Sequence, residues 1–136
     1  MLSDFEEELK AKFNDSNIHT DKYFGEIRDP QKVKIDINNL PLVLIDYIGD
    51  DNQSALKKRH SFSLYITHIS YSNNKKTRTS KHYELYELLE KIDKLLNLQS
   101  YSESEPIRVN RTRKIADQVT DIGYLTVFKK DFTVIL

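Results

Sequence analysis

The chain has 136 residues, of which 31% are charged and 38% are hydrophobic, and its formal net charge is zero. This length and balance suit a single domain over residues 1–136 with one core. There is no cysteine, which excludes disulfide bonds, thiolate metal sites and a cysteine nucleophile. No apolar run is long enough to span a membrane, and the acidic start MLSDFEEELK does not resemble a signal peptide. We therefore expect a cytoplasmic protein.

Residues 3–13 have the pattern of a short amphipathic helix. Ser3 can cap it, with Glu6 three places on completing a capping box. Its apolar stripe consists of Leu2, Phe5, Leu9 and Phe13. Residues 14–31 are polar and contain a glycine and a proline, so we interpret them as a long loop with a short extended piece near Tyr23.

Three strand-like runs follow. Residues 33–37 alternate apolar and polar side chains, which is typical of a half-buried edge strand. Residues 40–49, LPLVLIDYIG, are almost continuously apolar and predict a strand buried on both faces. Residues 59–69 alternate again, and we expect one face of this strand to meet a helix. That face carries His60, Phe62, Leu64, Ile66 and His68.

The strongest helical pattern lies at residues 80–98, where Ser80 is a candidate N-cap and Asn97 lies near a plausible end. Its apolar face consists of Leu85, Leu88, Leu89, Ile92, Leu95 and Leu96. Residues 71–82 are basic and rich in tyrosine, and we interpret them as a loop that leads into this helix.

The last third of the chain predicts two strands. Strict alternation over residues 107–114 places Arg111 and Arg113 on one face and Arg108 on the other, and the charges suit an edge strand. Residues 117–123 would connect it to a final strand over 124–136, with a bulge or bend at residues 129–131.

The order of the main elements is α-β-β-α-β-β, to which residues 33–37 would add a fifth strand at an edge. Strands joined by short loops favour an α+β domain with an antiparallel or mixed sheet of about four to five strands. We expect the two helices to pack on one face of that sheet.

Charge is unevenly placed along the chain. Residues 1–30 hold eight acidic and four basic side chains, whereas no acid occurs between Asp51 and Glu84. Such a split is typical of oppositely charged surfaces that meet in an assembly, of a basic patch for nucleic acid, or simply of solvated loops. The sequence alone leaves these alternatives open.

No catalytic pattern is recognisable. His60 and His68 lie eight residues apart on one strand, too far to share a metal ion. Asp46, Asp50 and Asp51 could begin a magnesium-dependent nuclease site, but the next strand offers no glutamate to complete it. The isolated glycines form no phosphate-binding loop. We therefore expect no catalytic residue, metal or cofactor, and no enzymatic activity.

Four segments, in their order, are similar to a known family. LPLVLIDY, the R-x-x-F-x-L-Y-I strand, the YELYELLEKIDKLL helix and GYLTVFKKDFTV resemble the tail-terminator (tail-completion) proteins of Mu-like tailed phages and prophages. The resemblance covers residues 39–136. It implies an antiparallel sheet with helices packed on it and a homo-oligomeric ring, commonly a hexamer, that caps the finished tail tube and joins the head connector. It implies no reaction and no cofactor.

This resemblance gives the basic residues a role as an interface. The expected partners are sister copies, the tail-tube protein and the head–tail connector protein, with no membrane, and the expected location is the bacterial cytoplasm and then the virion tail. The interface candidates are Lys75, Lys76, Arg78, Lys81, Arg108, Arg111 and Arg113. The alternative function is a small nucleic-acid-binding module that uses residues 71–82, against which the neutral total charge argues.

Overall fold

The computed structural model describes residues 2–29, 41–71, 74–121 and 123–136. These residues form two helices and one five-stranded mixed sheet, which confirms the predicted α+β class. In chain order the elements are α1 (Leu2–Asp15), β1 (His19–Lys22), β2 (Leu42–Asn52), β3 (Lys58–Ser70), α2 (Lys75–Leu96), β4 (Arg108–Thr120) and β5 (Gly123–Ile135). The strand expected at residues 33–37 lies outside the described residues.

The strand order across the sheet is β1-β2-β3-β5-β4, so β1 and β4 form its two edges. β1 pairs with β2 in parallel, and the other neighbours are antiparallel. β1 lies within residues 14–31, which we interpreted as a loop with a short extended piece near Tyr23, so that interpretation is wrong at residues 19–22. The predicted order α-β-β-α-β-β is corrected accordingly, because the described residues have a strand, β1, directly after α1. The four residues HTDK contain one buried side chain, Thr20, and so carry no apolar alternation that could predict a strand.

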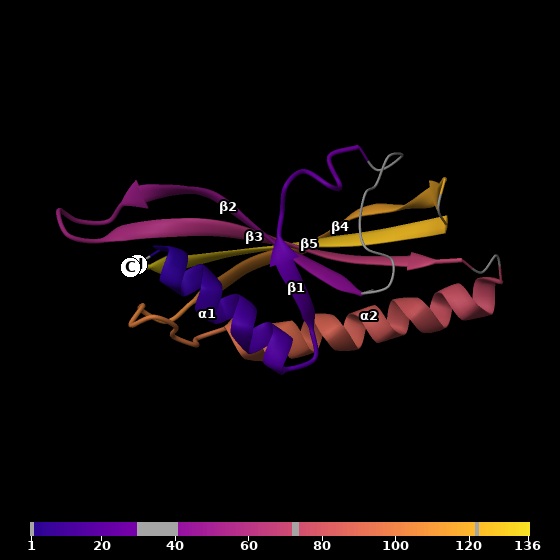
Figure 1. Ribbon diagram of the computed structural model, residues 1–136, viewed down its shortest axis with the longest axis horizontal. Helices are drawn as coiled ribbons and strands as arrows, with labels where there is room; N and C mark the ends of the chain where they lie inside the picture. The colour runs from indigo at the N-terminus through magenta and orange to yellow at the C-terminus, as the bar shows by residue number, and fades with distance from the viewer. Residues whose placement is uncertain (1, 30–40, 72–73, 122) are drawn as a thin grey trace.

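Both helices lie on one side of the sheet (Figure 1). α1 lies against β1 and also touches α2, whereas α2 reaches β3 and β4. The predicted stripe of α2 is confirmed, because Leu85, Ile92 and Leu96 are buried in the same cluster as Phe62 of β3. Phe5 of α1 completes this contact, with its ring centroid 5.5 Å from that of Phe62. Each such side chain contributes about 1.5–3 kcal/mol through its removal from water.

The opposite side of the sheet carries a second, smaller apolar cluster. It consists of Ile27, Leu42, Leu44, Ile69, Ala116, Leu125 and Val127. β2 contributes to both clusters, since Leu44 belongs to this one and Ile45 to the helix side. The prediction that this strand is buried on both faces is therefore confirmed for its first half, while its far end from Asp50 onward is exposed.

α2 begins at Lys75 and not at Ser80. Asn74 caps it, and its side-chain oxygen accepts a hydrogen bond from the backbone nitrogen of Lys76 at 2.8 Å. The predicted basic loop is therefore largely the first two turns of a helix. The residues TRTS have no apolar periodicity, which explains why the pattern of the sequence starts later. The predicted end is confirmed, with Asn97 as the C-cap.

The bulge predicted at residues 129–131 is wrong, because β5 pairs with β3 in continuous register through this region. The irregularities of the β4–β5 ladder lie in β4, at Asn110 and Ile115. β4 also continues to Thr120, so most of the expected connection at 117–123 is strand. The charged triplet at residues 129–131 contains a buried cation, Lys130. Lys130 has a side chain only 2% exposed, and its ammonium group lies 2.5 Å from Asp93 of α2.

Candidate interaction surface

The first turns of α2 carry four of the predicted interface residues. Lys75 and Lys76 are exposed, and the first turn contains no acidic residue. Because a helix N-terminus is already the positive end of the helix dipole, these lysines are unfavourable for the helix by a few tenths of a kcal/mol each, and they make this end attractive to anions. Arg78 and Lys81 are already engaged, with Tyr124 at 4.3 Å and Glu84 at 3.3 Å respectively.

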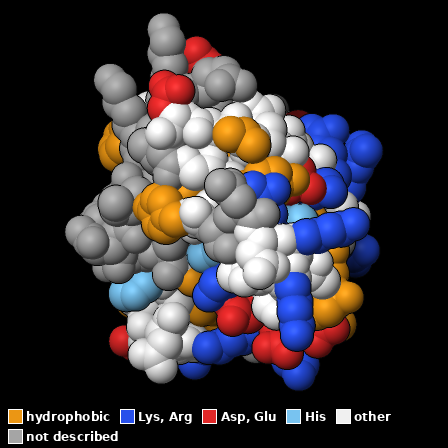
Figure 2. Space-filling view, turned by 90° about the vertical axis from the view of Figure 1, so that its right-hand side faces the viewer, with side chains coloured by type: hydrophobic (Ala, Val, Ile, Leu, Met, Phe, Trp, Pro, Cys, Tyr) orange, Lys and Arg blue, Asp and Glu red, His pale blue; other side chains and the backbone are white. Residues whose placement is uncertain are grey.

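Figure 2 views the end of the molecule where α2 begins, and Lys and Arg side chains gather across its centre and right-hand side. Exposed aromatic side chains belong to the same helix. Tyr83 is 61% exposed and Tyr86 is 46% exposed, and their ring centroids lie 6.0 Å apart. This end of the molecule therefore presents a basic surface with exposed tyrosine rings.

The three predicted arginines of β4 form a row on a single face of the sheet. Arg108, Arg111 and Arg113 pair across the ladder with Thr133, Asp131 and Lys129, three alternate residues of β5. Partners across an antiparallel ladder point to the same face. The intervening Lys130 points to α2, so the arginine row lies on the face opposite the helices.

The β-bulge at Asn110 produces this alignment. A regular strand would send Arg108 to the opposite face from Arg111 and Arg113, as strict alternation predicted. The register shift between Val109 and Arg111 inserts one extra residue and brings Arg108 onto the same side. The predicted division of the arginines between two faces is thus wrong.

The charges of the arginine row are not neutralised by the rest of the described residues, whose ion pairs involve none of the three. Asp131, directly across from Arg111, accepts a hydrogen bond from Ser63 at 2.6 Å instead. Alternate residues of a strand lie about 6.6 Å apart. The row therefore presents exposed guanidinium groups at roughly this interval along the β4 edge.

The predicted interface set thus divides into two surfaces. The lysines begin α2 on the helix side of the sheet, whereas the arginine row lies on the other side. The sequence grouped them by charge, but the sheet separates them.

A polar cluster that the sequence did not predict joins α2 to the β4–β5 hairpin. Asp117 accepts hydrogen bonds from Lys114 at 2.9 Å and from Thr126 at 3.1 Å, and Nε2 of His82 lies 3.4 Å from the same carboxylate. Burial opposes the charged carboxylate, but the hydrogen bonds outweigh it and lower the pKa of Asp117. Thr126 is only 2% exposed, and the contact between His82 and Asp117 joins α2 to β4, so the cluster anchors α2 to the sheet.

Asp46, Asp50 and Asp51, the carboxylates considered for a nuclease site, do not point to a common metal position. Asp50 lies 3.9 Å from Lys58 and Asp51 lies 3.2 Å from Arg59, so both belong to cross-strand ion pairs of the β2–β3 hairpin. Asp46 stands apart on the same strand, where burial raises its pKa. Within the described parts of the chain, no three His, Cys, Asp or Glu side chains are placed to hold a metal ion.

Among the described residues there is no helix with the length and apolar character needed to cross a membrane. No protein-family model matches the chain, and no curated protein sequence is similar to it.

Proposed function

We propose that this chain is a structural assembly protein that acts as a tail terminator. It would form a ring, commonly a hexamer, that caps the completed tail tube of a phage or prophage and presents a joining surface to the head connector. Such a protein would work in the bacterial cytoplasm during assembly and remain in the virion tail.

One observation supports an assembly role above the others. Lys75 and Lys76 are exposed at the start of α2, and the arginine row forms no ion pair with an acidic residue among the described residues. Burial of an unpaired guanidinium group costs free energy, whereas an exposed guanidinium group remains available to bind carboxylates of another protein surface. Arginine and tyrosine are also the residue types enriched at protein interfaces.

The proposal predicts that reversal of the arginine charges abolishes tail capping. The variant is R111E/R113E, and the assay is polymerisation of the tube protein encoded in the same gene cluster, with tube lengths measured by negative-stain electron microscopy. Wild-type protein should shorten the tubes and appear as a ring at one end, and the variant should do neither.

A control is K94E, which reverses an exposed lysine of α2 outside both surfaces. It should cap tubes as the wild type does. Tubes whose length and ends are unaffected by wild-type protein would refute the tail-terminator proposal, and full capping by R111E/R113E would remove the arginine row from it.

A second candidate function is nucleic-acid binding at the start of α2. Lys75 and Lys76 lie on the same helix as the exposed ring of Tyr83, and cations beside aromatic rings can bind single strands. Fluorescence anisotropy with a labelled single-stranded oligonucleotide tests this alternative. Binding that weakens steeply with salt and is lost in K75E/K76E would favour it over the assembly role.

A further inference from the structure

We infer that the arginine row of one copy docks on the outer side of α1 in a second copy of this chain. The inference rests on the proposed assembly function and identifies the contact through which the copies meet. The charged residues of α1 divide into two groups, one on the side that faces β1 and one on the outer side of the helix.

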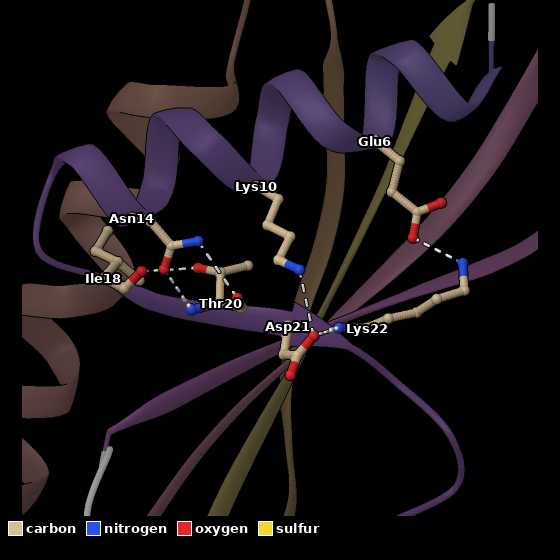
Figure 3. Close-up of polar contacts among 7 residues, drawn as sticks. All are labelled: Glu6, Lys10, Asn14, Ile18, Thr20, Asp21 and Lys22. Carbon is tan, nitrogen blue, oxygen red and sulfur yellow. Dashed lines mark hydrogen bonds and ion pairs between the residues drawn. The ribbon is translucent and has the colours of Figure 1, made fainter.

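The first group is neutralised inside the molecule. Glu6 accepts from Lys22 of β1 at 2.8 Å, and Lys10 donates to Asp21 of β1 at 3.4 Å (Figure 3). Asn14 adds a hydrogen bond from the backbone nitrogen of Thr20 at 3.1 Å. The side of α1 that faces β1 therefore has little charge left for a partner.

The second group lies on the outer side of α1 and forms an acidic stripe. Its members are exposed and recur at helical spacing with Ala11 between them, and Lys12 lies at their flank, four residues after Glu8. The acidic stripe consists of Glu7, Glu8 and Asp15. Glu8 also accepts a hydrogen bond from the backbone nitrogen of Ser102 at 2.6 Å, which holds the stripe against the loop before β4.

The two surfaces match in length and sign. From Glu7 to Asp15 the helix rises about 12 Å at 1.5 Å per residue. The arginine row spans the four ladder steps from Thr133 to Lys129, about 13 Å at 3.3 Å per residue, because the bulged Asn110 adds no step. Three guanidinium groups can therefore lie along three carboxylates over nearly the same distance, which favours charge-assisted hydrogen bonds between them.

The placement of the surfaces makes the contact head-to-tail. The acidic stripe lies on the helix layer, and the arginine row lies on the opposite face of the sheet near the other edge. Each copy therefore carries the acidic stripe on one side and the arginine row on the other. Such a heterologous contact repeats from copy to copy and closes into a ring when the rotation permits.

Two features favour a second copy over other occupants of the arginine row. On this face Tyr23 and Tyr65 stack on each other with ring centroids 4.4 Å apart, which covers one side of each ring and reduces its use as a platform for a base. The bulges at Asn110 and Ile115 disrupt the β4 ladder and oppose the addition of an extended peptide as a further strand.

The test is a charge swap between two variants. E7K/D15K makes the stripe basic and R111E/R113E makes the row acidic, so each variant alone places like charges against each other. We expect each to raise the concentration for half-assembly at least about tenfold in sedimentation equilibrium. In a 1:1 mixture with the two variants alternating, both contacts are attractive. One contact joins the lysines of E7K/D15K to the glutamates of R111E/R113E, and the next joins the unchanged arginine row to the unchanged acidic stripe. The mixture should therefore assemble with the two variants alternating, which native mass spectrometry can resolve.

The control is E87K/E90K, a reversal of two exposed glutamates of α2, which should assemble as the wild type does. Circular dichroism establishes that every variant is folded. Wild-type assembly that neither swap variant disturbs, or a mixture that stays dissociated, would overturn this contact and leave the tail-terminator proposal standing. A wild-type chain that never associates with itself would contradict both.

Discussion

Substitutions at the ion pair between Lys130 of β5 and Asp93 of α2 test the packing of α2 on the sheet. The side chain of Lys130 is 2% exposed, and its ammonium group donates to Asp93 and to Thr112, each at 2.5 Å. Asp93 in contrast is 49% exposed. The two partners of this ion pair should therefore respond very differently to substitution.

Replacement of Asp93 by alanine leaves a buried ammonium group with one hydroxyl partner. An uncompensated buried charge costs about 3–5 kcal/mol, and partial access of water through the half-exposed Asp93 position reduces this to about 2–4 kcal/mol. Replacement of Lys130 by methionine keeps the buried aliphatic chain and releases Asp93 to water. We expect K130M to lie within about 1 kcal/mol of the wild type.

Urea unfolding followed by circular dichroism measures both free energies of unfolding. In a thermal scan followed by the same signal, D93A should lower the melting temperature by roughly 6–15 °C and K130M by only a few degrees. The double variant K130M/D93A should resemble K130M, because without the cation the loss of the carboxylate has little effect. A K130M variant less stable than D93A would refute the reasoning that the buried cation dominates this site.

Two further predictions concern the β4–β5 hairpin. The pKa of Asp117 is lowered in the folded state, so its contribution to stability is present above the unfolded pKa of about 3.9 and is lost as the pH falls through the folded value. D117N should thus be less stable than the wild type at pH 7, and urea unfolding should show this difference shrinking below about pH 4; a constant difference would contradict the assignment. Gly123 has φ +143°, and a Cβ atom there would lie 2.8 Å from Ile69 and 2.9 Å from the carbonyl oxygen of Ser70. G123A should cost about 1–3 kcal/mol of unfolding free energy, more than G49A, where no atom lies within 4 Å of the added Cβ; equal costs would be the contrary result.

The parts of the fold that the sequence predicted are those with a strong apolar period. Leu85 and Ile92 recur on one face of α2, and Leu44 and Ile45 lie in a continuous apolar run, so their burial followed from pattern alone. β1 was missed because HTDK has no such pattern and exists through its pairing with β2. The start of α2 was missed because its first turns are polar and depend on the cap at Asn74.

The candidate surfaces were predictable in composition but not in arrangement. Charge counting found the arginines of β4, but their alignment depends on the bulge at Asn110, which is a property of pairing with β5. The polar cluster of His82 and Asp117 unites residues far apart in the chain, with no local signal to connect them. Strand register and helix docking thus determine which charges act together.

Association of copies of this chain through oppositely charged surfaces should depend on salt. Sedimentation velocity of the wild-type protein over a range of salt concentrations measures this dependence, because contacts between exposed charges weaken as screening increases. We predict assemblies larger than the monomer at low ionic strength that dissociate as salt is added. A monomer at every protein and salt concentration, or an assembly that salt does not affect, would contradict this mode of association.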